Sequence, residues 1–173
     1  MENLLLKQTS TETWQALVQE SAIKASVLLS HELESYLVFL LMRFSKMPTL
    51  CMSVLAIEYL TIQTTYTGMQ KEHLRDLGDK CLLFSGLFPG QARHKNVSVD
   101  YFVQLGRTAY LDLADMTHDT LSQLYLNLSA EFITLMEVLL ASWEQKAAHT
   151  LLPTEITQTL EIIRRNKPWR SWH

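Results

Sequence analysis

Apolar residues recur at steps of three and four along nearly the whole chain, and this spacing is the strongest constraint on the fold. It is the period of an α-helix that turns one side toward a core. Only five glycines and four prolines occur in 173 residues, which is too few for the many turns of a β-sandwich or barrel. We therefore predict an all-α fold of six or seven helices, bundle-like or orthogonally packed, in a single domain spanning residues 1–173.

The most apolar helical segment covers residues 31–45 and follows Ser30, whose hydroxyl can cap the helix start. Apolar side chains occupy its core stripe and its other faces, at Leu33, Tyr36, Leu37, Val38, Phe39, Leu40, Leu41, Met42 and Phe44. A helix that is apolar nearly all round is buried nearly all round. We therefore expect residues 31–45 to form the central helix of the domain.

The remaining helices are predicted from the same spacing together with cap and stop signals. We expect one helix to begin after Thr11 and another to be capped by Ser98. Further helices are predicted over residues 50–64, 69–87, 119–146 and 153–166. The helix over 119–146 is expected to be the longest.

Three glycines, Gly78, Gly86 and Gly106, fall inside these predicted helices. Gly in a helix costs about 0.5–1 kcal/mol relative to Ala. A close approach of another helix or of a ligand offsets that cost. We therefore expect tight contacts at these positions.

The charge distribution is uneven. The formal net charge of −3 gives no basic footprint for nucleic acid over the whole chain, so nucleic acid is not an expected partner. The last ten residues nevertheless combine bases with tryptophans, at Arg164, Arg165, Lys167, Trp169, Arg170 and Trp172. We favour a tail that packs on the domain or frays over an arm that binds nucleic acid or an anionic membrane surface.

The chain shows no signal-peptide pattern and no apolar run long enough for a membrane span. Its longest apolar run, residues 36–42, has seven residues, against the ~18–20 that a span requires. Cys51 and Cys81 each lie beside apolar residues and are expected to be reduced thiols. We therefore expect a cytoplasmic protein.

Five charged residues fall on helix faces that should be buried: Glu34, Arg43, Glu58, Asp79 and Arg107. A lone buried carboxylate costs several kcal/mol, so it must be paired, bound to a metal or protonated. One interpretation is a structural network, in which Glu34 and Asp79 pair with Arg43 and Arg107. The other is a functional site lined by these groups.

Recognised catalytic and metal-binding motifs are missing from the sequence. It contains no Gly-x-Ser-x-Gly elbow, P-loop, dinucleotide fingerprint, HExxH or zinc-type cysteine spacing. His73 and Asp76 share a helix face and are weak candidates for metal ligands, near a helix start where exposure is usual. The sequence therefore leaves the cofactor unknown.

Three stretches resemble a family of uncharacterised bacterial helical proteins: ESYLVFLLMRF at 34–44, GDKCLLFSGLFP at 78–89 and YFVQLGRTAY at 101–110. The resemblance spans roughly residues 10–115. It implies a bacterial, cytoplasmic protein. It implies no activity and no catalytic residue.

Two hypotheses of function follow. In the first, the chain is a non-enzymatic helical protein that acts through protein–protein contacts, with a homodimer expected. In the second, it binds a small molecule or metal, as a binding protein or as an enzyme, with the site at the cluster of Glu34, Glu58, Asp79 and Arg107.

Overall fold

The computed structural model describes residues 2–46, 71–87 and 99–145. These residues form six α-helices and no strand: α1 (Glu2–Lys24), α2 (His31–Lys46), α5 (Lys71–Leu87), α7 (Val99–Asp115), α8 (Asp119–Ala130) and α9 (Phe132–Trp143). The predicted all-α class is confirmed. The helices expected over 50–64 and 153–166 lie outside the described residues.

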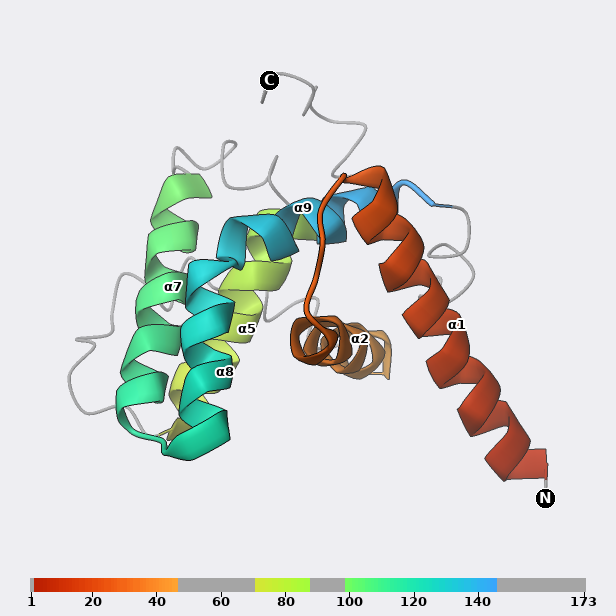
Figure 1. Cartoon of the computed structure of the whole chain (residues 1–173), viewed down its shortest axis with the longest axis horizontal. Coiled ribbons are helices and arrows are strands. Elements are labelled where there is room, and N and C mark those ends of the chain that lie inside the picture. The colour runs from red at the N-terminus through yellow and green to blue at the C-terminus, as the bar shows by residue number, and fades with distance from the viewer. Residues whose placement is uncertain (1, 47–70, 88–98, 146–173) are drawn as a thin grey trace.

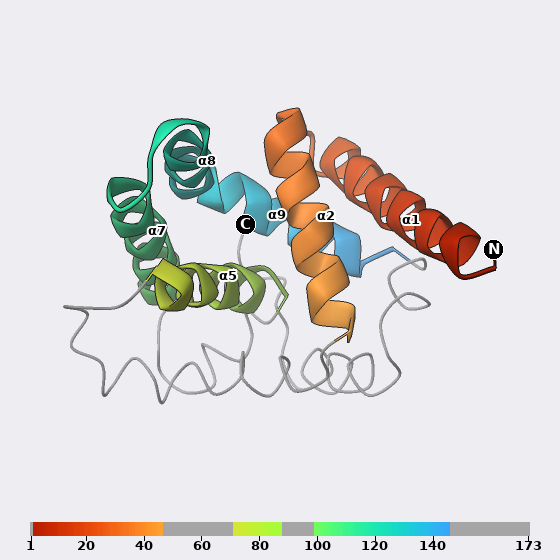
Figure 2. The same ribbon diagram turned by 90° about the horizontal axis from the view of Figure 1, so that it is seen from below.

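The helices surround one continuous core (Figures 1 and 2). α5, α7 and α8 form one group, α9 crosses an end of that group, and α2 lies between the group and α1. α5 packs on α7 and α9, while α1 packs on α2 and α9. Buried side chains from all six helices join in a single hydrophobic cluster.

The most enclosed helix is α5, in which every residue from Cys81 to Leu87 is buried. The expectation that residues 31–45 would be buried nearly all round is wrong. The inner side of α2 is buried, but the ring of Phe39 is 64% exposed. The apolar pattern could not show that one side of α2 stays open.

The start of α1 also differs from the prediction. The helix begins at Glu2, so Thr11 lies within it rather than capping it. The residues before Thr11 include Glu, Leu, Lys and Gln, which are good helix formers and favour a helix that begins well before Thr11.

The end of α1 has a defined turn. Ser26 adopts a φ of 57°, and the amides of Ser26 and Val27 donate to the carbonyls of Ile23 and Ala22 at 3.0 Å each. This is the Schellman pattern that ends many helices. Ser30 lies four residues after Ser26, and its predicted role as the cap of α2 is confirmed, because the amide of Leu33 donates to Ser30 Oγ at 3.3 Å.

The predicted single helix over 119–146 is two helices, α8 and α9, bent by 70°. The break falls at Glu131, where no Gly or Pro marks it. The bend lets α8 pack on α7 while α9 packs on α5 and α1. Within the described residues no single helix has the length and apolar character of a membrane span, and only the bent pair passes that test by length and composition.

The glycines make the close approaches that were expected. A Cβ on Gly86 would lie 2.7 Å from Leu139 Cβ of α9, and one on Gly106 would lie 2.6 Å from the Phe132 ring. At Gly78 it would lie 2.6 Å from the Tyr110 ring of α7. The small residues therefore set how closely α5, α7 and α9 can pack.

Candidate functional site

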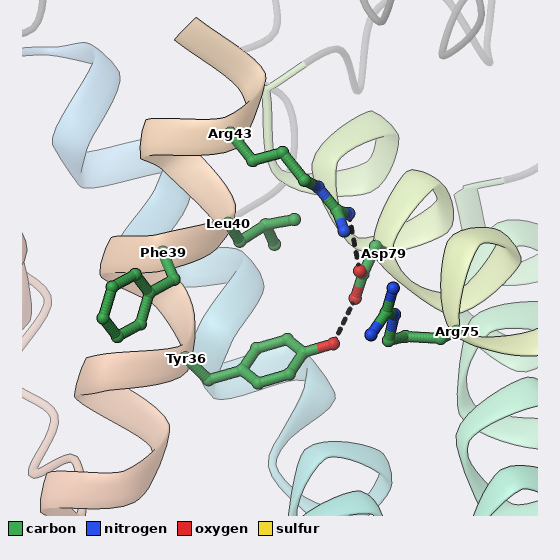
Figure 3. Close-up of a pocket in the computed structure, with 6 residues that line it drawn as sticks. All are labelled: Tyr36, Phe39, Leu40, Arg43, Arg75 and Asp79. Atoms are coloured by element: carbon green, nitrogen blue, oxygen red, sulfur yellow. Dashed lines mark hydrogen bonds and ion pairs between the residues drawn. The ribbon is translucent and has the colours of Figure 1, made fainter. Parts of the chain in front are cut away.

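Asp79 of α5 is the best-enclosed charged residue in the described part of the chain, with 2% of its surface exposed. Its Oδ1 accepts hydrogen bonds from Tyr36 Oη of α2 at 2.6 Å and from Tyr110 Oη of α7 at 2.7 Å. Its Oδ2 accepts one from Arg43 Nη2 of α2 at 2.7 Å. Three donors from two neighbouring helices thus converge on one carboxylate, two of them drawn in Figure 3.

Burial raises the pKa of Asp79, while the hydrogen bonds from Tyr36 and Tyr110 and the charge of Arg43 oppose that rise. Burial also raises the pKa of both tyrosines, and the neighbouring carboxylate raises it further. For Arg43, burial acts to lower the pKa, but the charge and hydrogen bond of Asp79 prevail and raise it. The tyrosines therefore keep their protons and serve as donors, and Arg43 stays charged.

The neighbour of Asp79, Gly78, explains how Tyr110 reaches the carboxylate. The Tyr110 ring lies over Gly78, where a Cβ would come within 2.6 Å of Cε1. Any larger residue at position 78 would push the ring away from α5. Gly78 therefore leaves the space that the Tyr110 ring occupies, and Asp79 accepts the hydrogen bond from its hydroxyl.

A cleft with a volume of about 210 Å³ opens between α2 and α5, and Asp79 forms part of its wall. Its lining comes from one face of α2 and one row of α5: Tyr36, Phe39, Leu40, Arg43, Arg75 and Asp79 (Figure 3). The α2 positions are spaced by three and four, and the α5 positions by four, so each set shares a helix face. The cleft therefore combines apolar side chains with two guanidinium groups and one carboxylate.

Arg75 is the second cation of the cleft and is exposed. No ion pair joins it to a described carboxylate, whereas Arg43 pairs with Asp79. Its charge and a hydrogen bond act on the hydroxyl of Tyr125, where they oppose the rise in pKa caused by burial. The cleft therefore carries one positive charge that Asp79 does not compensate.

Among the members of the predicted charged cluster that the structure describes, Arg43 and Asp79 are the two that come together. Glu34 is half-buried and accepts hydrogen bonds from the α1 side chains Gln15 and Gln19, at 3.2 and 2.9 Å. The predicted pairing of Glu34 is therefore not seen among the described residues. Its helix face was assigned correctly as inward, but that face meets α1 rather than α5.

Arg107 of α7 also lies apart from Asp79. Its Nε donates to the Ser129 carbonyl at 3.1 Å, and Ser129 Oγ donates to the Arg107 carbonyl at 3.0 Å. Ser129 lies two residues before the break between α8 and α9. The predicted pairing of Arg107 with a carboxylate is replaced by a reciprocal contact that fixes the end of α8 on α7.

The other predicted site residues are outside the cleft or outside the described residues. Glu58 and the basic tail over 164–173 belong to the second group. Asp76 pairs with Lys80 at 2.6 Å, and His73 is exposed. In the part of the chain that the structure describes, no three His, Cys, Asp or Glu side chains gather as metal ligands would.

Sequence reasoning missed five residues of the site as members of a polar or binding constellation, namely Tyr36, Phe39, Leu40, Arg75 and Tyr110. Tyr36 was counted only as an apolar position, and Tyr110 was noted only as part of the stretch YFVQLGRTAY at 101–110. Their hydroxyls are the missed signal, because a buried Tyr usually finds a hydrogen-bond partner. Arg75 gave no signal, since an exposed arginine is unremarkable in a sequence.

Comparisons with known proteins add no analogue. No protein-family model matches the chain, and no similar protein was found among the curated proteins or the solved structures. The resemblance of the three sequence stretches thus stays a prediction, and the site is interpreted from its own geometry.

Proposed function

We propose that this protein binds a small organic molecule in the cleft between α2 and α5. The observation that carries the proposal is the composition of the cleft wall. It joins an exposed aromatic ring, Phe39, to two arginines and a carboxylate that is buried and held by three donors. Ligand sites are typically apolar pockets with a few well-placed polar groups.

The buried ion pair supports the proposal on energetic grounds. A buried ion pair is often no more stabilising than apolar residues of similar volume. Asp79 keeps a raised pKa despite three donors, so those donors do not fully offset its burial. A group held at such a cost, next to a cleft, is typical of functional sites.

The same groups favour binding over acid–base catalysis. The hydroxyls of Tyr36 and Tyr110 keep their protons and already donate to Asp79. Both oxygens of that carboxylate accept hydrogen bonds from protein donors. We therefore propose a binding protein, and we keep the bacterial origin and cytoplasmic location implied by the sequence resemblance as part of the proposal.

A calorimetric titration of the full chain with benzoate, benzyl alcohol and benzylamine tests the proposal. At least one of these should bind, and Phe39→Ala should weaken that binding by severalfold because Phe39 belongs to the cleft lining. Tyr101→Ala is the matched control, because Tyr101 is another exposed ring, on α7 and outside the cleft lining. Binding of none of the three, or equal loss in both variants, would overturn the proposal.

A second candidate function, contact with another protein, is favoured by the turn that follows α1. Leu28 is 99% exposed and Ile23 is 76% exposed. The Schellman turn fixes the backbone between them, so these apolar side chains project from a defined corner. Contiguous exposed apolar patches are typical of interaction surfaces, and a second copy that covers Ile23 and Leu28 would remove both from water.

Sedimentation velocity tests this second candidate in the form of the expected homodimer. The wild-type chain should sediment as a dimer over a micromolar range, and Leu28→Ser with Ile23→Ser should shift it toward monomer. Leu121→Ser is the control, because Leu121 is an exposed leucine on α8. A monomeric wild-type chain would exclude the homodimer.

A further inference from the structure

We infer that the ligand of the cleft is an aromatic monocarboxylate, whose carboxylate binds Arg75 and Arg43 and whose ring lies against the apolar part of the wall. The inference rests on the proposed function and adds the chemical class of the ligand. It follows from three properties of the cleft: its charge, the geometry of its donors and its volume.

The charged residues that line the cleft favour a ligand with one negative charge. Two arginines and one aspartate line it, and the aspartate is engaged by Arg43 at 2.7 Å. The nearby Asp76 is engaged by Lys80 at 2.6 Å. Arg75 thus keeps a positive charge with no carboxylate partner in the described part of the chain, and a monoanion would balance it.

The donors of the cleft suit a planar anion. A guanidinium presents N–H groups in a flat fork that matches a carboxylate with two parallel hydrogen bonds. Asp79 accepts a hydrogen bond from Nη2 of Arg43, and no further hydrogen bond joins the other N–H groups of Arg43 to a described residue, so within that part of the chain they can donate to a ligand together with those of Arg75. Asp79 and its tyrosines fix Arg43 in place, which leaves less side-chain freedom to be lost on binding.

The volume of the cleft limits the part of a ligand that the cleft can enclose. A cavity of about 150 Å³ holds a benzene molecule, and drug-sized ligands need roughly 300 Å³ or more. The value of about 210 Å³ fits one ring and one small substituent. Leu40 and the ring of Tyr36 provide the apolar surface for that ring, with Phe39 at the edge of the lining.

The experiment compares probes that share a ring and differ in charge, by calorimetric titration of the full chain. Benzoate should bind at least about tenfold more tightly than benzyl alcohol, because a charged hydrogen-bonded pair contributes an energy of that order. Benzylamine should not bind. Acetate should bind more weakly than benzoate, because it lacks the ring.

Two substitutions test whether Arg75 binds the carboxylate of the ligand. Arg75→Gln should weaken benzoate binding by about tenfold and leave benzyl alcohol unaffected. Arg75→Lys should give an intermediate loss, since the charge remains and the fork is removed. Lys24→Gln is the charge-matched control, because Lys24 is an exposed cation on α1 outside the cleft lining, and it should bind benzoate as the wild type does.

The outcomes separate this inference from the proposed function. Benzyl alcohol binding as tightly as benzoate, with no effect of Arg75→Gln, would overturn the monocarboxylate and leave a ligand-binding cleft. Tighter binding of phenyl phosphate than of benzoate would overturn it in favour of a phosphate ester. Absence of binding by every ring compound would overturn both proposals.

Discussion

The two sides of α5 differ in how they meet their neighbours. Toward α7 and α9, the glycines of α5 lie directly against side chains: a Cβ on Gly78 would lie 2.6 Å from the Tyr110 ring of α7, and one on Gly86 would lie 2.7 Å from Leu139 Cβ of α9. Toward α2, the helix presents Asp79 and Arg75 to a cleft of about 210 Å³. One side is closed and apolar, and the other is open and charged.

The difference indicates that one side of α5 stabilises the fold, whereas the other side carries the proposed binding site. Close packing on the α7 and α9 side buries every residue from Cys81 to Leu87 and holds α5 in one position. That support lets the α2 side keep a buried carboxylate and an unfilled volume, which by themselves do not favour folding. Tyr110 connects the two sides, because its ring packs over Gly78 and its hydroxyl donates to Asp79.

The largest effect is expected when the open side loses its ion pair. Arg43→Met should lower the free energy of unfolding by about 3 kcal/mol at neutral pH, because Asp79 would stay buried without a counter-charge. We take the low end of the usual range because the Arg43 side chain is 36% exposed. Chemical denaturation followed by circular dichroism measures this change.

The pH dependence of that loss follows from the carboxyl group. Burial already raises the pKa of Asp79, and removal of Arg43 raises it further. The folded variant therefore binds a proton at a pH where its unfolded chain does not, so its stability rises as pH falls through the pKa of Asp79. The loss in free energy of unfolding caused by Arg43→Met should therefore become smaller in acid. Adding Asp79→Asn to Arg43→Met should recover part of that loss. A loss that does not depend on pH would contradict this account.

The next largest effect is expected on the closed side. Gly86→Ala should lower the free energy of unfolding by about 2 kcal/mol, as overpacking does in well-packed cores. The added Cβ would lie 2.7 Å from Leu139 Cβ and 3.2 Å from the Met136 carbonyl oxygen, atoms close to the backbone of α9 that cannot move alone. A helix position in open space would gain about 0.5–1 kcal/mol from the same change.

The exposed position Thr108 on α7 serves as the control for that measurement. Thr108→Ala should change the free energy of unfolding by less than about 0.5 kcal/mol. If Gly86→Ala stabilises the protein, then α5 and α9 can separate without loss, and the contrast between the two sides of α5 disappears.

The sequence predicted the contacts of the closed side better than those of the open side. Helical spacing and interior glycines were enough to predict an all-α core with close approaches at Gly78, Gly86 and Gly106. A helix period gives the direction of a side chain relative to its own helix, but not which helix it will meet. Glu34 therefore faced α1, and Arg107 faced the end of α8, instead of joining Asp79 and Arg43.

The bend between α8 and α9 was missed for a related reason. Kinks are expected at Pro or Gly, and neither occurs at Glu131. The break is set by tertiary contacts, namely the pair of hydrogen bonds between Arg107 and Ser129 and the packing of α9 across α5. These contacts join residues far apart in the sequence, so no local pattern contains them.

The smallest effect on folding is expected at the rim of the open side. Phe39→Ser should change the free energy of unfolding by less than about 0.5 kcal/mol, because its ring is 64% exposed and removing it creates no cavity. The neighbouring Leu40 is 3% exposed, and Leu40→Ala should cost about 2 kcal/mol or more in the same denaturation experiment. A large loss for Phe39→Ser would mean that the ring closes the core, and α2 would then have no free face on which a cleft could bind a ligand.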